Sequence, residues 1–253
     1  MTLKQIYETL TPEIQKLKQS LLNLHRDYVY DLEHEGGTIL RQEDAIAEYE
    51  EKMERFFSVK MTAFLILLAK MIREAVELSV KNFKEDGAKY ADVKYIEETL
   101  GIKNGKIEKY HGKKMTVLFA IGSLWVLRND VTFLTNNSFN GMVKRKDLWR
   151  AVEKSVNRKY YDFFETYAIG TIFQSYNASQ LSFARKYDYE KFVYEGGIVE
   201  ESRDFCIERA GLEFHRSQGL EWNEMDWKGK IPGVDFFIQC GGYNCLHHIE
   251  WIE

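Results

Sequence analysis

Prolines and cysteines are both scarce in this chain of 253 residues, which has two prolines and three cysteines. So few cysteines exclude a disulfide-rich secreted scaffold, and the odd number leaves at least one thiol outside any intramolecular disulfide. The hydrophobic share of 45% and the aromatic share of 14% exclude a disordered or low-complexity chain. We therefore expect a folded protein of one or two domains in a reducing compartment.

Long hydrophobic runs are also missing. The most apolar stretch, residues 61–72, is interrupted by Lys70 and is shorter than the roughly 18–20 residues that span a bilayer. The first ten residues hold no apolar segment behind a basic one, so no secretory signal is visible. These features predict a buried helix at 61–72 and no membrane partner.

Motifs typical of common enzyme classes are absent as well. The chain has no phosphate-binding loop, no dinucleotide-binding glycine pattern and no HExxH helix. We therefore predict no catalytic residue and a protein that is not an enzyme.

The net charge of −4 is small, but the charges are segregated. Residues 101–160 carry 13 basic and 4 acidic side chains, a net charge of +9, whereas residues 1–100 carry 14 and 19, a net charge of −5. A basic middle favours a negative partner, and the run Lys144, Arg145 and Lys146 is the candidate contact to DNA or to a partner protein. The alternative is a solvated helix start.

Helical patterns dominate the first two thirds of the chain. Thr11, Pro12 and Glu13 form a helix-start signal, and apolar residues at three-to-four spacing follow it up to Leu24. Further helical patterns cover residues 42–83, with a break near Ser58, and then 90–100, 145–157 and 158–184. Residues 101–115 are rich in turns, and the apolar run 117–131 is consistent with either a helix or a strand.

The pattern changes after about residue 190, where short apolar runs alternate with turn signals. Gly196-Gly197 and Gly241-Gly242 each follow a run typical of a β-strand, which indicates tight turns between short strands. The predicted fold class is therefore α+β, with a mostly helical body at 1–165 and a small α+β module of short strands at 166–253.

Potential metal ligands are concentrated in this last segment. Cys206, Cys245 and His247 offer the thiolates and imidazole that a structural zinc ion prefers, with Cys240 or His215 as a possible fourth ligand. Because paired C-x2-C motifs are missing, the alternative is that the cysteines are small core residues. A nucleophilic cysteine or a histidine-based nuclease site is a further, less favoured alternative.

Five pieces of the C-terminal third occur in a recognisable order. They are an Asn-centred helix TIFQSYNASQLSFAR (171–185), a strand, turn and S-R-x-F-C in FVYEGGIVEESRDFC (192–206), a turn at Ala210-Gly211, a W-x-G-K-I-P-G motif within WNEMDWKGKIPG (222–233), and GGYNCLHH (241–248). This order resembles the phage Mu F-like minor head proteins, also called head morphogenesis proteins. The positions that match the family's motif are Asn177, Arg203, Cys206, Gly241, Gly242, Cys245 and His247, whereas Leu246 replaces an arginine that is common in the family.

The resemblance implies a component of a tailed-phage or prophage head. Such proteins act near the portal during head assembly, so the implied partners are the portal protein, the major capsid protein and double-stranded DNA. The implied location is the virion, near the portal or inside the capsid, with the host cytoplasm as the place of assembly. The alternative function is a small phage-encoded, metal-dependent effector or nuclease that uses the Cys/His cluster.

Overall fold

The computed structural model describes residues 2–31, 62–85, 144–160, 168–243 and 245–252, together with short pieces between residues 34 and 60 and between 102 and 114. The helix predicted at 90–100, the apolar run at 117–131 and the boundary predicted at 165/166 lie outside the described residues. Within them the fold is mostly helical with a small C-terminal antiparallel sheet, which confirms the α+β class.

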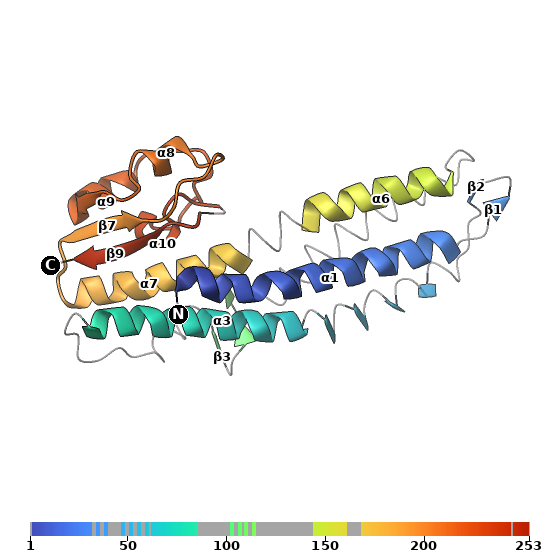
Figure 1. Cartoon of the computed structure of the whole chain (residues 1–253), viewed down its shortest axis with the longest axis horizontal. Coiled ribbons are helices and arrows are strands. Elements are labelled where there is room, and N and C mark those ends of the chain that lie inside the picture. Colours follow the sequence, from blue (N-terminus) through green and yellow to red (C-terminus); the bar gives the residue numbers. More distant parts are fainter. Residues whose placement is uncertain are drawn as a thin grey trace.

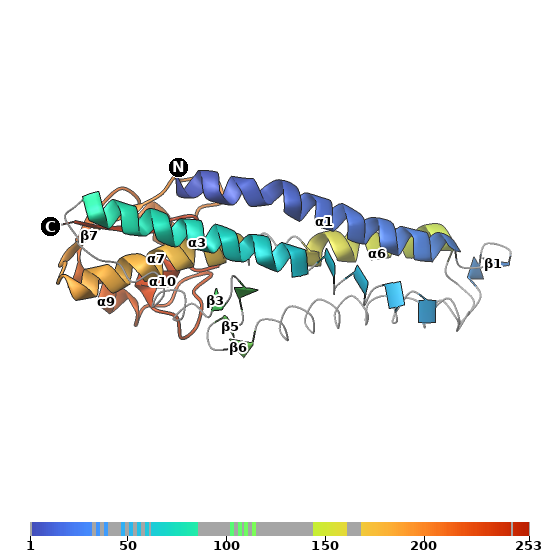
Figure 2. The same ribbon diagram turned by 90° about the horizontal axis from the view of Figure 1, so that it is seen from below.

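Among the described residues, four long helices form the helical body: α1 (Leu3–Asp31), α3 (Thr62–Glu85), α6 (Arg145–Tyr160) and α7 (Gly170–Lys186). Because α7 packs against α3, it is grouped with the body although it falls within the predicted 166–253, and residues 187–252 are called the C-terminal module. Helices α1, α3 and α7 run side by side, and α6 packs on α1 at the end away from the sheet (Figures 1 and 2). Two of these helices are 29 and 24 residues long, but no described helix is both long and apolar enough to cross a membrane.

The predicted start of the first helix at Thr11 is wrong, because α1 begins at Leu3 and includes Pro12. Thr2 caps the helix: its Oγ1 accepts from the backbone N–H of Gln5, and the Gln5 side chain accepts from the N–H of Thr2. Ile6 and Leu10 are fully buried and extend the apolar stripe toward the N-terminus. Burial of this stripe outweighs the hydrogen bond that Pro12 cannot make.

Short antiparallel hairpins occur at two places outside the body. Strands β1 (His34–Glu35) and β2 (Thr38–Ile39) pair after α1. The described pieces of the segment 101–115 form two further strand pairs: β3 (Ile102–Lys103) with β4 (Lys106–Ile107), and β5 (Lys109–Tyr110) with β6 (Lys113–Lys114).

The C-terminal sheet has three antiparallel strands in the order β8-β7-β9, where β7 is Lys191–Glu195, β8 is Glu213–His215 and β9 is His248–Ile252. Phe192 of β7 lies opposite Phe214 on one side and Trp251 on the other. Alternate residues of β7 and β9 are buried, as the period of a half-buried strand requires. Figure 1 shows α7 between α3 and this sheet, so one helix supports both parts of the molecule.

Three short helices complete the C-terminal part: α8 (Asp204–Ile207), α9 (Arg216–Trp222) and α10 (Phe236–Gln239). The β-strand predicted just before Gly241-Gly242, in the run FFIQC (236–240), is wrong, because Phe236–Gln239 form α10 and Cys240 is its C-cap. The Asp235 side chain accepts from the backbone N–H of Phe237, which caps the helix and outweighs the β-propensity of the aromatic pair. Trp222 and Trp251 are buried and Trp227 packs against the same core, so all three serve packing.

Two hydrophobic clusters share α3 and α7. One cluster joins α1 and α6 to the first half of α7, and the other joins the end of α7 to the sheet and short helices. Val76 and Val80 of α3 belong to the second cluster, whereas Ile72 belongs to the first. Helices α3 and α7 of the body therefore also pack against the C-terminal module.

Candidate functional site

Three of the predicted metal ligands meet in the C-terminal module. Cys206 comes from α8, Cys245 from the turn before β9, and His247 from the residue that precedes this strand. The two Sγ atoms lie 4.0 Å apart, and Cys245 Sγ lies 3.5 Å from His247 Nδ1. All three donor atoms lie within 4.8 Å of one another, although the cysteines are 39 residues apart in the sequence.

The cluster is buried, since the exposed fractions of Cys206, Cys245 and His247 are 2%, 6% and 4%. The His247 ring stacks on Tyr194 of β7 with a centroid distance of 5.0 Å. Gly196 lies against the same ring, and a Cβ at this position would approach His247 Cδ2 to 2.6 Å. These two contacts restrain the imidazole, whose Nδ1 lies toward Cys245 Sγ, and its buried Nε2 has no hydrogen-bond partner in the described part of the chain.

The two thiols of the cluster differ in acidity. A hydrogen bond from Cys245, followed by one from His247, lowers the pKa of Cys206 to about 4, although burial opposes this shift. The pKa of Cys245 is raised by its hydrogen bond to Cys206 and by burial. Cys206 is therefore the more readily deprotonated thiol of the pair, and a thiolate is the form of cysteine that binds metals.

Gly241 and Gly242 lie where a side chain cannot fit, which gives the physical reason for glycine at both motif positions. A Cβ on Gly241 would lie 2.4 Å from Cys206 Sγ and 2.9 Å from Cys245 Sγ. Gly242 has a φ of +92°, and a Cβ there would lie 1.9 Å from the carbonyl oxygen of Gly229. The backbone N–H of Gly241 also donates to Cys245 Sγ at 3.1 Å.

Asn177 is a buried cross-link between α7 and the module. Its Oδ1 accepts from the backbone N–H of Ile249 at 3.0 Å, and its Nδ2 donates to the carbonyl of Ile238 at 3.1 Å. The same Nδ2 contacts Cys240 Sγ at 3.2 Å. The central asparagine of the helix thus uses both ends of its amide to join β9 and α10 to the body.

Neither residue expected as a possible fourth ligand joins the cluster. Cys240 is fully buried beside Asn177, and burial raises the pKa of its thiol well above the ordinary value. His215 caps α9, where its Nδ1 accepts from the backbone N–H of Ser217, and its Nε2 lies 3.5 Å from Glu190. Both side chains therefore have local structural roles.

Arg203 binds the loop that carries Cys245. Its guanidinium donates to the carbonyl of Tyr243 and lies against Gly229, where a Cβ would approach Arg203 Nε to 2.5 Å. This arrangement agrees with a fixed hydrogen bond to a backbone carbonyl rather than with a solvated surface arginine. Arg203 thus connects the start of α8 to the segments 227–230 and 241–245.

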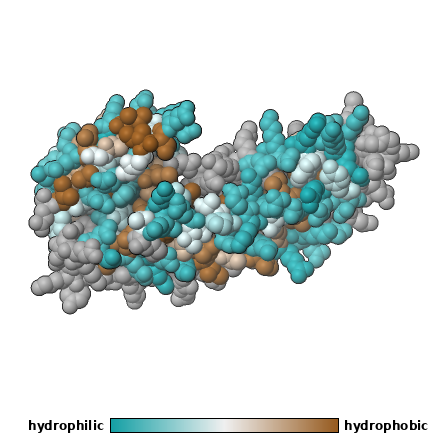
Figure 3. Space-filling view, in the orientation of Figure 1, coloured by the Kyte–Doolittle hydropathy of each residue, from teal (hydrophilic) through white to brown (hydrophobic). Residues whose placement is uncertain are grey.

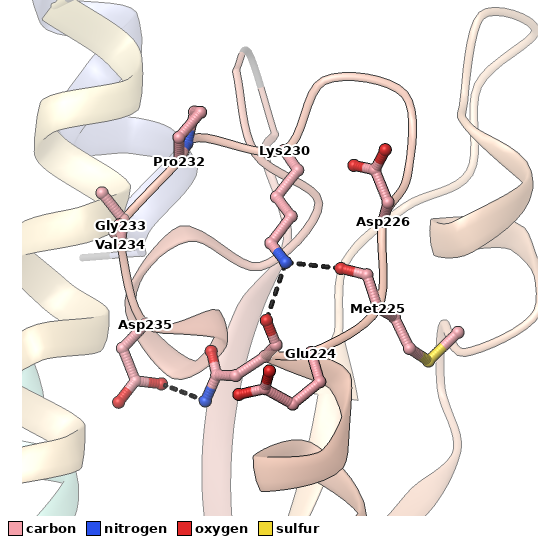
Figure 4. A pocket seen from close by; sticks show the side chains of 9 residues that line it. Glu224, Met225, Asp226, Lys230, Pro232, Gly233, Val234 and Asp235 are labelled. Carbon is pink, nitrogen blue, oxygen red and sulfur yellow. Dashed lines mark hydrogen bonds between the residues drawn. The ribbon is translucent and has the colours of Figure 1, made fainter.

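The W-x-G-K-I-P-G loop is organised by a lysine. Lys230 Nζ donates to the carbonyl of Asn223 at 2.7 Å and to the carbonyl of Met225, and Figure 4 shows the contact between Lys230 and Met225. These contacts lie in a cavity that is also lined by Asp226 and Asp235. The Lys230 ammonium therefore binds backbone carbonyls and holds the loop against the end of α9.

Residues outside the predicted set also build the site. Gln239 of α10 accepts from the N–H of Ile231 at 2.5 Å and donates to the carbonyls of Ile231 and Val234. Trp227 donates from Nε1 to the carbonyl of Gly241 and stacks on Phe205. Tyr194, Lys230 and Gln239 were missed because a tyrosine in a strand, a lysine in a loop and a glutamine in an amphipathic run are also typical of ordinary packing or solvation.

The basic run lies at the other end of the molecule. Lys144 and Lys146 are exposed, and the Arg145 guanidinium lies 5.7 Å from the ring centroid of Tyr30, near the end of α1. Figure 1 places the start of α6 far from the C-terminal module. The structure therefore does not bring Lys144, Arg145 and Lys146 to the Cys/His cluster, and most of the basic stretch 101–143 lies outside the described residues.

The described surface of the body is mainly hydrophilic in the view of Figure 3, and apolar atoms gather over the α8 end of the module. Ile207 of α8 is 46% exposed, and Leu212 before β8 is also exposed.

The chain matches no protein-family model, no curated protein and no solved structure. The motif order and the geometry of the Cys/His cluster are therefore the features of the chain that bear on its function.

Proposed function

We propose that the chain is a minor head protein that acts in head morphogenesis of a tailed bacteriophage or prophage, near the portal. The observation that carries this proposal is the convergence of the motif residues. Asn177 binds the backbone of β9, Arg203 binds the loop before Cys245, and Cys206 contacts Cys245. The five sequence pieces that resemble the family thus describe a single folded unit rather than scattered similarities.

The nature of these contacts supports the same function. Each motif side chain binds backbone groups or another motif side chain, so the motif specifies how the module folds. A pattern that specifies a fold is expected to be shared by proteins with the same module, whatever surface loops they carry. The resemblance therefore carries more weight than five short motifs would carry separately.

The molecule offers separate surfaces for head components and for DNA. The exposed lysines at the start of α6 fit a phosphate-bearing partner, because phosphate neutralisation releases counterions. The apolar surface at Ile207 fits a protein partner such as the portal or major capsid protein. An elongated molecule with these surfaces at opposite ends is suited to a position between the portal and packaged DNA (Figure 1).

Burial of the Cys/His cluster argues against the alternative of a metal-dependent effector or nuclease. A catalytic metal ion needs an open coordination position that a substrate can reach. The three ligands are almost fully buried, and His247 is covered by Tyr194 and Gly196. We therefore assign the cluster to stabilisation of the module rather than to turnover.

The test is incorporation into heads. The full-length tagged chain is produced in cells that assemble the corresponding heads, and particles are separated by sedimentation. We expect the wild type and Gly197→Ala to sediment with procapsids, because a Cβ at Gly197 meets no atom within 4 Å. Gly242→Val, which forces a clash with the Gly229 carbonyl, is expected to be lost from particles and to reduce infectivity.

Assembly of infectious heads in cells that lack the chain would overturn the proposal. Metal-dependent cleavage of DNA or RNA by the purified wild type, lost in His247→Ala, would favour the alternative instead.

A further inference from the structure

A fourth donor atom faces the Cys/His cluster. The Tyr194 hydroxyl lies 3.4 Å from Cys206 Sγ and 3.7 Å from Cys245 Sγ. We infer that Cys206, Cys245 and His247 bind one zinc ion and that the Tyr194 hydroxyl oxygen completes a tetrahedral set of ligands. This inference does not depend on a role in head assembly.

Four of the six distances between the donor atoms match those of a tetrahedral zinc site, and Cys206 Sγ lies within 4.8 Å of the His247 donor atom. With Zn–S bonds of about 2.3 Å and Zn–N or Zn–O bonds of about 2.0 Å, a regular tetrahedron has edges of about 3.8 Å for S–S and about 3.5 Å for S–N or S–O. The observed S–S separation is 4.0 Å, and the S–N separation is 3.5 Å. The two S–O separations are 3.4 and 3.7 Å, close to the expected edge.

The charge of the site supports a divalent cation. Two thiolates and Zn²⁺ sum to zero, so a neutral imidazole and a hydroxyl complete the set without leaving a net charge in the core. Zinc binding would release to solvent any proton still held by the two thiols. The backbone N–H of Gly241 already donates to Cys245 Sγ, which is the supporting hydrogen bond that a bound thiolate needs.

Tyr194 is held for this role by the fold. It is fully buried on β7, and its ring lies between His247 and Phe236, with centroid distances of 5.0 and 6.1 Å. A Cβ on Gly241 would also lie 3.4 Å from the Tyr194 hydroxyl. The glycine therefore leaves room for three of the four donor atoms to approach one another.

A zinc ion here would join three separate parts of the module: β7 through Tyr194, α8 through Cys206, and the segment before β9 through Cys245 and His247. These parts are short, and a metal that binds only the folded state stabilises it by mass action. The site is therefore a structural staple within the C-terminal module.

The test begins with the full-length wild type, purified without chelator and analysed for its elements. We expect one zinc ion per chain, and X-ray absorption with two sulfur and two nitrogen or oxygen neighbours. Co²⁺ added to the metal-free protein should give the visible spectrum of a tetrahedral ion with thiolate ligands. Because this spectrum uses the wild type, it remains informative if the cysteine variants fail to fold.

Tyr194→Phe tests the fourth ligand, since it keeps the ring and removes only the oxygen. We expect the zinc dissociation constant, measured by competition with a chelator, to increase at least tenfold, and the Co²⁺ spectrum to change. The control is Tyr243→Phe, which removes an exposed hydroxyl from the same motif and should leave both unchanged. Cys206→Ala and His247→Ala should abolish stoichiometric binding.

Two results would overturn the inference. A wild type that neither contains zinc nor binds added zinc or Co²⁺ would remove the metal site altogether. Unchanged zinc affinity and an unchanged Co²⁺ spectrum in Tyr194→Phe would remove Tyr194 from the ligand set.

Discussion

Gly241→Ala is the smallest substitution that tests how closely the Cys/His cluster is packed. The added Cβ would lie 2.4 Å from Cys206 Sγ and 2.9 Å from Cys245 Sγ, both shorter than real Cβ contacts. Both sulfurs are buried, so neither can move into solvent to make room. The φ angle of Gly241 is not positive, and the expected penalty therefore comes from contact alone and not from backbone strain.

The expected magnitude follows from overpacking of a buried site, which destabilises proteins by about 1–3 kcal/mol. For a chain of this size each kcal/mol lowers the melting temperature by about 2–4 °C, so the expected decrease is about 2–12 °C. The measurement is urea denaturation and thermal unfolding at a fixed zinc concentration, followed by tryptophan fluorescence. Gly197→Ala is the matched control, because its Cβ meets no atom within 4 Å.

A double-mutant cycle identifies the atom responsible. In a Cys206→Ala background the closest sulfur is gone, so Gly241→Ala should cost less than half of what it costs in the wild type. An unfolding midpoint for Gly241→Ala equal to that of Gly197→Ala would refute the steric argument. Equal penalties with and without Cys206 would show that the destabilisation arises elsewhere.

Three further predictions concern other parts of the structure. Asn177→Ala should destabilise the chain by at least about 2 kcal/mol in urea unfolding, because it leaves the Ile249 N–H and the Ile238 carbonyl without their side-chain partner. The control, Gln19→Ala on the exposed face of α1, should cost under about 0.5 kcal/mol. Lys230→Met should cost about 1–3 kcal/mol through lost bonds to two carbonyls, and a loss no larger than that of the exposed Lys228→Met in the same assay would contradict this. Burial lowers the pKa of His25 from 6.5 to about 4, so the unfolded chain binds a proton more readily, and stability should fall by up to about 3 kcal/mol as the pH drops from 6.5 to 4. Urea midpoints between pH 7.5 and 4 should show a shallower dependence in His25→Gln, and identical slopes would refute the assignment.

The sequence predicts those features that local patterns encode. Alternation and turn signals locate β7 and β9, and apolar spacing locates the middle of α1 and of α7. The start of α1 and the identity of α10 could not be predicted, because each depends on a competing interaction. At Pro12 tertiary burial outweighs a local break, and at FFIQC the Asp235 cap outweighs β-propensity.

The candidate site likewise contains residues that the sequence predicts and a residue that only the fold identifies. Cys206, Cys245 and His247 could be nominated from residue type, because structural zinc sites are built mainly from cysteine and histidine. Tyr194 could not, since its relevance depends on where β7 places one hydroxyl relative to two sulfurs. Cys240 and His215 have suitable chemistry but lie in other contacts. Residue type thus identifies candidates, and only the fold decides which of them meet.

The location of the cluster bears on the kind of function it serves. Asn177 ties the module to α7, the helix that also packs against the rest of the body through α3. A zinc ion that joins α8 to the segment before β9 would therefore also fix the surface near α8 relative to the body. Rigid placement of a surface is what an assembly component needs, whereas an enzyme needs access to its metal. The burial of these ligands and their connection to α7 both favour the former.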